Sequence, residues 1–221
     1  GEAVPIAQKV QFTVSVPPTA AYSVSQNGVL VHRSGTSDAT RLLVWVDRSG
    51  KEEPIPSPPH SYQQPRLSPD GRRVAVEIEG QVWLYDLSRQ TLTRLTFEGN
   101  NNDIPAWTPD GKHVTYRSTS SRGVALTWQL ADGSGGREIL ASGTQYAPSS
   151  WFPDGQRLAF TENLPTQMGR NIQLLSLADR KVQPFLATQF AEGAPEFSPD
   201  GHWIAYTSNE SGRFEVYVQP F

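Results

Sequence analysis

The 221-residue sequence contains no cysteine, which excludes disulfide bonds, thiolate metal sites and cysteine nucleophiles together. It also lacks any apolar run near the roughly 18 to 20 residues of a membrane-spanning helix, so we expect no direct insertion into a membrane. The amino end GEAVPIAQKV has neither the basic nor the apolar region of a secretory signal. Since the chain starts at Gly1 and stops straight after FEVYVQPF, we expect an excised segment or a processed product.

A strong excess of positive charge is absent as well. The formal net charge is −3, and the lysines and arginines are scattered along the chain, so nucleic acid is not an expected partner. No stretch has the 3.6-residue periodicity of a long helix. The 37% hydrophobic and 10% aromatic content nevertheless suffices for a sizeable core, and we expect a folded protein built from strands.

One short sequence is repeated. LSPDG at 67–71 returns as WTPDG, WFPDG and FSPDG, and the aspartates of these copies are Asp70, Asp110, Asp154 and Asp200. They are separated by 40, 44 and 46 residues, and the degenerate copy VSQNG places Asn27 another 43 residues before Asp70. Five units of similar length therefore fill the chain.

Each unit has the same internal pattern. An aromatic or aliphatic residue precedes the turn, and an alternating run follows it, as in RRVAVE, KHVTYR, QRLAFT and HWIAYT. A third run such as QVWLYDL and, in the complete units, a fourth such as TLTRLTF come next. Four short antiparallel strands in about 40 to 45 residues are typical of a β-propeller blade. We therefore predict one all-β propeller domain over 1–221, with blades at about 20–60, 61–100, 101–144, 145–190 and 191–221.

The fifth unit offers three strands, while a spare strand lies ahead of the first unit. We expect this amino-terminal clasp strand, 4–18, to complete the last blade and close the ring, because an exposed sheet edge invites aggregation. The alternative is an open arc of a larger propeller. A closed ring predicts a monomer, and an open arc predicts a dimer formed through its open edges.

The segments PRLSPDGRRVAVE, VWLYDL, TRLTF and PEFSPDGHWIAYTSNESGRFEVYVQPF resemble the TolB-type propeller repeat, a relative of WD-type repeats. From about residue 20 the chain is similar to the propeller that follows the kinase domain of many bacterial serine/threonine protein kinases. The resemblance implies a protein-binding module, favours an extracytoplasmic or periplasmic location, and implies six or more blades. Kinase chemistry itself needs a Gly-rich loop and His-Arg-Asp and Asp-Phe-Gly motifs, which the sequence lacks.

The repeated acids favour a structural role. In Pro-Asp-Gly, proline presets φ, the aspartate caps the turn and glycine adopts a conformation that other residues avoid. We predict structural turns at Asn27, Asp70, Asp110, Asp154 and Asp200. Because equivalent residues of different blades lie at one radius of a closed ring, we do not expect these acids to converge on a substrate.

The links between units supply the candidate binding residues. They are expected to cross the face where the central channel opens, and they carry Gln63, Gln64, Asn102, Asp103, Gln145, Tyr146 and Glu192. Convergent amides and carboxylates on such a rim can hold a peptide or coordinate a cation, with calcium at the channel mouth as the possible ion. The alternative is a rim that is merely solvated. No resident cofactor is expected.

Two classes of function remain. The first is a non-catalytic module that binds a protein or peptide, as the sensor or scaffold part of a larger bacterial protein. The second is a propeller hydrolase, lactonase-like or glycosidase-like, in which Glu192 and Asp103 surround a metal at the channel mouth. A zinc site across blades is not expected, because the histidines fall in different units without ligand spacing: His32, His60, His113 and His202.

Overall fold

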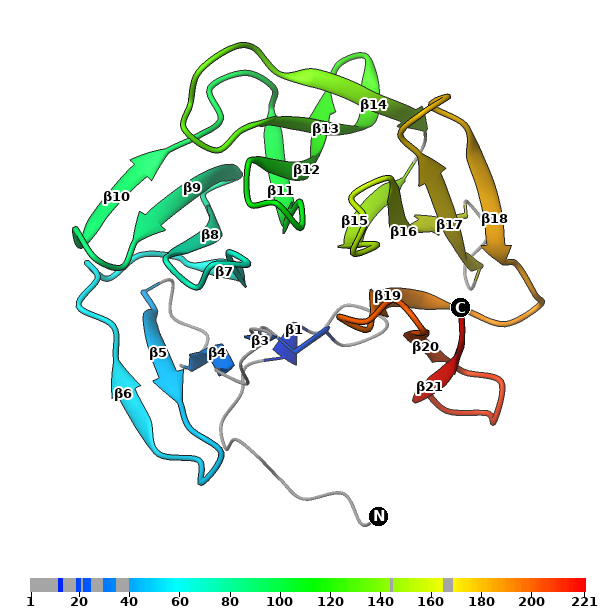
Figure 1. Ribbon diagram of the computed structural model, residues 1–221, viewed down its shortest axis with the longest axis horizontal. Helices are drawn as coiled ribbons and strands as arrows, with labels where there is room; N and C mark the ends of the chain where they lie inside the picture. Colours follow the sequence, from blue (N-terminus) through cyan, green and yellow to red (C-terminus); the bar gives the residue numbers. More distant parts are fainter. Residues whose placement is uncertain are drawn as a thin grey trace. The chain divides into compact units, whose positions relative to one another are not determined.

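All regular structure in the described part of the computed structural model is β-strand (Figure 1). The structure describes residues 40–143, 145–164 and 169–221, and before residue 40 the backbone of four strands only. Within these residues there is no helix with the length and apolarity to cross a membrane. The chain divides into two compact units, residues 1–97 and 98–221.

The first unit contains a two-stranded sheet and two four-stranded antiparallel blades. The small sheet is β1 (Phe12–Thr13) and β2 (Thr19–Ala20). The first blade is β3 (Tyr22–Val24), β4 (Leu30–Ser34), β5 (Leu42–Val46) and β6 (Glu52–Pro54), and the second is β7 (Gln63–Leu67), β8 (Arg73–Ile78), β9 (Gln81–Asp86) and β10 (Thr91–Arg94). One hydrophobic cluster joins the two blades, with Leu43 and Ile55 from the first and Val74, Val76 and Tyr85 from the second.

The second unit contains two more four-stranded blades and a three-stranded sheet, here named the fifth sheet. The third blade is β11 (Asn101–Trp107), β12 (His113–Ser120), β13 (Gly123–Leu130) and β14 (Glu138–Gly143). The fourth is β15 (Tyr146–Trp151), β16 (Arg157–Asn163), β17 (Arg170–Ser176) and β18 (Val182–Leu186), and the fifth sheet is β19 (Gly193–Phe197), β20 (Trp203–Ser208) and β21 (Glu215–Pro220). Within this unit the first strands β11, β15 and β19 pack next to one another, and β14 and β18 lie at the periphery (Figure 1).

The alternating run after each turn forms the second strand of its sheet, which is buried on both faces. In β12, Val114 and Tyr116 are buried on one face, while Thr115 between them is fully buried on the other. The small residue leaves room for an aromatic residue of the next blade, since Trp151 Nε1 donates a hydrogen bond to Thr115 Oγ1 at 3.1 Å. Blades of this unit therefore pack face to face through a small residue and a large one.

Four of the five predicted blades are found as four-stranded sheets, and five complete blades are not confirmed. The fifth sheet has β19, β20 and β21, and no other described strand joins it. In the predicted clasp segment 4–18, the described strand β1 pairs with β2 instead, while the rest of that segment lies outside the described residues. Closure of the ring by the clasp strand stays a prediction.

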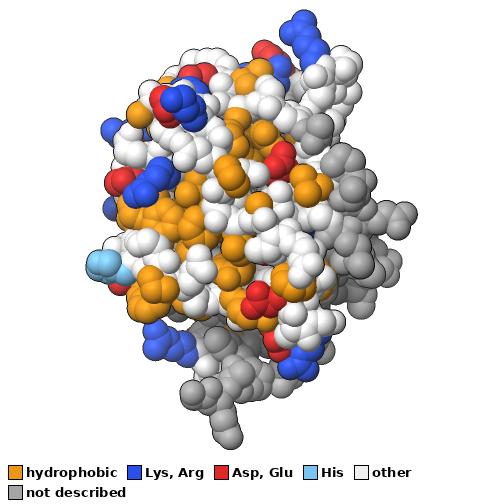
Figure 2. Space-filling view, turned by 90° about the vertical axis from the view of Figure 1, so that its right-hand side faces the viewer, with side chains coloured by type: hydrophobic (Ala, Val, Ile, Leu, Met, Phe, Trp, Pro, Cys, Tyr) orange, Lys and Arg blue, Asp and Glu red, His pale blue; other side chains and the backbone are white. Residues whose placement is uncertain are grey.

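The fifth sheet exposes a face that the other sheets bury. Four of the sheets carry an equivalent residue in the third strand. Its cross-strand partner lies two positions after the small residue of the second strand. These third-strand residues are Val82, Leu126, Ile172 and Val216. The first three are 0% exposed, whereas Val216 is 71% exposed. Val218 and Trp203 of the same sheet are also exposed, and hydrophobic side chains gather on the side of the molecule that Figure 2 shows.

Candidate functional site

The repeated aspartates make the hydrogen bonds of a capped turn. In the second blade, Ser68 Oγ donates to Asp70 Oδ1 at 2.6 Å, and the Arg72 amide donates to the same oxygen at 3.1 Å. The following Gly71 has φ +70°. The hydrogen bond from Ser68, followed by that from Arg72, holds the pKa of Asp70 below its ordinary value although burial opposes this.

The other turns repeat this geometry with one exception. Thr108 and Ser198 donate to Asp110 and Asp200 as Ser68 does to Asp70. Asp154 receives a hydrogen bond from the Gln156 amide, but the equivalent of Ser68 in the fourth blade is phenylalanine. Asn27, predicted to serve the first unit in the same way, lies outside the described residues.

The predicted rim residues of the third blade are buried and engaged within their own sheet. Asn102 is 0% exposed, and its amide donates to the Glu98 carbonyl oxygen at 2.7 Å. Asp103 is 9% exposed and forms a bidentate ion pair with Arg117, in which Nε donates to Oδ1 at 2.7 Å and Nη2 donates to Oδ2. Any ligand of this carboxylate has to compete with a guanidinium already in place.

The rim residues near the fourth blade differ in exposure. Gln145 is exposed, whereas Tyr146 is buried against Phe160, with ring centroids 4.7 Å apart. Glu192 is 1% exposed, and Thr188 Oγ1 donates to its Oε1. Its other oxygen, Oε2, is buried and accepts no hydrogen bond from the described residues.

A β-bulge places several of these side chains. Gln64, Ile104 and Ala194 each precede a proline, and each has a positive φ of 48°, 53° and 50° respectively. The register of the first and second strands shifts at these points. Such a bulge turns the neighbouring side chains away from the regular alternation of a strand. Gln63 and Gln64 are half-buried at the bulge of the first unit. Ligand binding at the rim stays a prediction.

Metal ligands are not clustered in the described part of the chain, where no three His, Asp or Glu side chains lie together in a way that could hold an ion. His113 stacks on Trp128, His60 packs against Tyr62 and His202 contacts Asp200. The His32 side chain lies outside the described residues. Calcium at the channel mouth stays a prediction.

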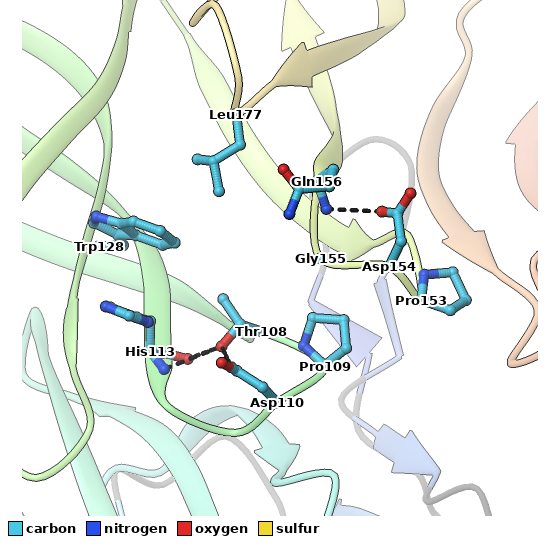
Figure 3. Close-up of a pocket in the computed structure, with 10 residues that line it drawn as sticks. All are labelled: Thr108, Pro109, Asp110, His113, Trp128, Pro153, Asp154, Gly155, Gln156 and Leu177. Carbon is cyan, nitrogen blue, oxygen red and sulfur yellow. Dashed lines mark hydrogen bonds between the residues drawn. The ribbon is translucent and has the colours of Figure 1, made fainter.

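A cavity of about 410 Å³ opens between the third and fourth blades of the second unit (Figure 3). Its lining comes from the turn after β11, the start of β12, the second half of β13, the turn after β15 and the residue directly after β17. The residues are Thr108, Pro109, Asp110, His113, Trp128, Pro153, Asp154, Gly155, Gln156 and Leu177. Here we name this space the inter-blade cavity.

A small side chain contributes to the inter-blade cavity. Thr108 and Phe152 hold the same position in successive blades, directly after the tryptophan that ends the first strand. Phe152 fills the equivalent space beside the fifth sheet, where its ring contacts Phe197 and Phe221, with centroids 5.3 Å away in both cases. A Cβ added to Gly201 would lie only 2.9 Å from that ring. Thr108 is too small to do the same at Gly155, and the space stays open.

Two aromatic rings line one side of the inter-blade cavity, and an ion pair behind them holds the indole. The His113 and Trp128 rings stack with centroids 4.1 Å apart, and both face the space in Figure 3. Trp128 Nε1 donates to Glu138 at 2.8 Å, and Glu138 in turn pairs with Arg180 at 2.6 Å. These contacts fix the indole ring in one orientation, which makes the wall rigid.

Two of the repeated acids, Asp110 and Asp154, line this same cavity, because neighbouring turns of the second unit lie on either side of one blade interface. That the turn acids do not converge on a substrate stays a prediction. Burial acts to raise the pKa of Asp110, but hydrogen bonds from Thr108 and Lys112 outweigh it, and the pKa lies below its ordinary value. The carboxylate is therefore charged at neutral pH.

Sequence reasoning missed Trp128, Leu177 and Gln156 as lining residues. Phenylalanine at 152 stands where the other copies have serine or threonine, but this break marks the interface that is filled. Thr108 follows the regular pattern, so the turn motif gives no signal of the inter-blade cavity.

No family model matches the chain. The chain is 21% identical over 192 residues to an uncharacterised protein of Agrobacterium fabrum, covering 83% of this chain and 63% of that protein. It is 23% identical to an uncharacterised peptidase of Bacillus subtilis, covering 67% of this chain and 30% of the peptidase. It is 28% identical to the Tol-Pal system protein TolB of Alcanivorax borkumensis, covering 45% and 23%. The chain thus spans less than two thirds of each relative.

Solved structures give the same fold at low identity. TolB of Acinetobacter baumannii matches with a TM-score of 0.73 and 20% identity, over 90% of this chain and 51% of that one. An oligogalacturonate lyase of Vibrio parahaemolyticus matches with a TM-score of 0.66 and 15% identity, over 90% and 64%. A chain of the nidogen/laminin complex matches with a TM-score of 0.67 and 12% identity, over 93% and 80%. The protein therefore has an all-β, TolB-like β-propeller fold, and its relatives include bacterial proteins.

Proposed function

We propose that this protein is a non-catalytic module that binds a peptide segment of a protein partner, with the inter-blade cavity as its anchor. The observation that carries the proposal is a space of about 410 Å³ lined by His113, Trp128 and Leu177 together with polar residues of two turns. Concave sites with apolar walls and a few convergent polar groups are the usual places for ligands. The volume suits one or two side chains of a peptide.

The composition of the lining favours binding over catalysis. It contains one histidine and one hydroxyl residue, but Thr108 Oγ1 donates to Asp110 and accepts from the His113 backbone amide. That hydroxyl is committed to the hydrogen bonds of the turn. Propellers of similar fold occur in TolB and in a nidogen/laminin complex, which supports protein binding as the type of function.

The wider setting follows the same proposal. Since the curated relatives are longer than the matched segment, we propose that the module serves as sensor or scaffold in a larger bacterial protein, as in kinases that carry such propellers. A monomer is proposed if the ring closes and a dimer if it does not. Sedimentation analysis of the chain separates the two.

The metal-dependent hydrolase remains a second candidate because of Glu192, whose buried Oε2 lacks a hydrogen bond from the described residues. Peptidase and lyase relatives make it worth testing. Calcium at 100 times its dissociation constant would stabilise the fold by about 2.7 kcal/mol. A melting temperature unchanged by calcium, manganese and zinc would remove this candidate.

The binding function is tested by closing the inter-blade cavity. Thr108→Phe copies the residue that fills the equivalent space at Phe152. Ser198→Phe is the matched control, because it removes the same turn hydrogen bond but lies outside the cavity. A random peptide library displayed on phage is selected on the wild-type chain. We expect clones that bind the wild type and Ser198→Phe but not Thr108→Phe. Clones that bind all three variants equally would refute the cavity as the anchor.

A further inference from the structure

The space beside the fifth sheet shows which group occupies the equivalent of the inter-blade cavity when it is filled. There the Phe152 ring lies over Gly201, which is buried, and a Cβ added to Gly201 would lie 2.9 Å from that ring. Gly155 has the same place in the turn that lines the inter-blade cavity. It is half-buried, and an added Cβ would meet Pro109 Cδ at 4.0 Å, an ordinary van der Waals distance. The inter-blade cavity is therefore open where the equivalent space holds a phenyl ring.

A neighbour of the Phe152 ring also has an equivalent in the inter-blade cavity. Phe221, whose ring centroid lies 5.3 Å from that of Phe152, follows the third strand of the fifth sheet. Its amide donates to the His202 carbonyl oxygen at 2.9 Å. Leu177 follows the third strand of the fourth blade, lines the cavity, and donates to the equivalent carbonyl oxygen of Gln156 at 2.8 Å. An apolar side chain thus stands at the same place beside both spaces, and only one of them holds a ring.

The aromatic side chains of the lining offer ring edges to a ligand. The His113 and Trp128 rings stack with centroids 4.1 Å apart, and the Trp128 and Trp151 rings stack with centroids 5.9 Å apart. These contacts use the faces of the indole, and its Nε1, which donates to Glu138, points away from the space in Figure 3. The carbon edge of the indole is left for a ligand. Such an edge carries partial positive charge and attracts the negative face of another ring, so it favours an aromatic group over a cation or an aliphatic group.

The opening of the inter-blade cavity is more polar than its interior. Asp110, Asp154 and Gln156 are exposed, whereas Leu177 and Trp128 are half-buried. A peptide can therefore place one ring inside the cavity while its backbone stays beside polar groups and water, where amides find hydrogen-bond partners.

We propose that the inter-blade cavity binds an aromatic side chain of the partner peptide, with phenylalanine as the best fit. This inference rests on the proposed function, and it adds the chemical class of the anchoring residue. The ring of the peptide lies over Gly155, as the Phe152 ring does in the equivalent space beside the fifth sheet. It packs against Leu177, and its face meets the edges of the Trp128 and His113 rings.

Two small probes test the inference directly. N-acetyl-phenylalanine N-methylamide and its cyclohexylalanine analogue, which has a similar size but no aromatic face, are titrated into the full chain. The Gly155 amide and the Leu177 methyl groups are followed by NMR, with the Gly201 amide as internal control. We expect saturable shifts at Gly155 and Leu177 for the phenylalanine probe at roughly millimolar concentration. We expect none at Gly201, where Phe152 already fills the space. No saturable shift at Gly155 and Leu177 would overturn the proposal.

Variants with matched controls test the place and the edge contact. Trp128→Leu copies Leu174, the residue at the equivalent position of the fourth blade. Because an aromatic pair adds to the affinity beyond burial, this variant should lower the preference for the phenylalanine probe over the cyclohexylalanine probe by about two- to tenfold. An unchanged preference would contradict the aromatic assignment. Thr108→Phe should abolish binding of both probes and Ser198→Phe should not; binding that survives in Thr108→Phe would overturn the site.

The phage selection separates this inference from the proposed function. The clones that bind the wild type but not Thr108→Phe should share an aromatic residue. Cavity-dependent clones without a shared aromatic residue would overturn the aromatic assignment and still support the proposed function. The absence of every cavity-dependent clone would refute the proposed function, while saturable binding of the phenylalanine probe would still support an aromatic-binding cavity.

Discussion

The exposed face of the fifth sheet leads to a prediction about stability, because one position of the repeat is buried in one sheet and exposed in another. Ile172 and Val216 are equivalent, at 0% and 71% exposure. Ile172→Ala removes three buried carbons, which is about 2.4 kcal/mol at about 0.8 kcal/mol each, and the residual cavity brings the loss into the range of about 2–5 kcal/mol. Val216→Ala removes two carbons that are mostly exposed already, which is about 0.5 kcal/mol.

The measurement is urea unfolding of the full chain, with amide hydrogen exchange in β16 and β17 reporting the second unit itself. A lysine at each position sharpens the contrast, since Ile172→Lys should unfold the second unit and Val216→Lys should leave it intact. If Val216→Lys destabilised the chain by as much as the Ile172 variants, that face would be covered in solution. The reasoning from equivalent positions would then be refuted.

Three further predictions concern single contacts. Arg117→Met strands the buried Asp103 carboxylate, and we expect a loss of about 2–4 kcal/mol in urea unfolding that Asp103→Asn in the same chain partly restores. Gly71→Ala should lower the free energy of unfolding by about 1 kcal/mol through its φ of +70° alone, because no atom lies within 4 Å of the added carbon. Gly136 is equally open but has no positive φ, so Gly136→Ala should leave the stability unchanged. Destabilisation by both variants would contradict this reasoning. The hydrogen bond from Ser198, then those from His202, lower the pKa of Asp200 to about 2. The folded state therefore binds fewer protons than the unfolded state, and its stability should fall as the pH drops from about 4 to 2. Ser198→Ala should flatten this pH dependence, and an unchanged slope would argue against a role of the Ser198 hydrogen bond.

Periodicity carried much of the fold. The spacing of the turn acids placed the strands of the second, third and fourth blades, because Pro-Asp-Gly has one mechanism wherever it occurs. The sequence could not establish a fourth strand for the fifth sheet. Local patterns show that a segment forms a strand, but they do not show with which distant strand it pairs most stably. Strand β1, inside the predicted clasp, found its partner eight residues away from Phe12 at Ala20.

The candidate site was less accessible from the sequence. Asp103 was expected at an open rim, but the bulge at Ile104 and the cross-strand pairing with Arg117 bury it. That pairing depends on register, which the sequence leaves unspecified at a bulge. The inter-blade cavity could not be predicted from the sequence. It exists because Thr108 is too small to fill the space between two packed sheets, and such a space depends on how both sheets pack.

The contrast between Thr108 and Phe152 has a consequence for how such a chain acquires new specificity. Both positions follow the end of a first strand, where the side chain points into the seam between sheets without taking part in strand pairing. A large residue at this position fills the space between two neighbouring sheets, and a small residue leaves it open, while the strand pairing of both sheets is unchanged. Substitutions can therefore change the interfaces between sheets one at a time, and ligand preference can diverge faster than the fold.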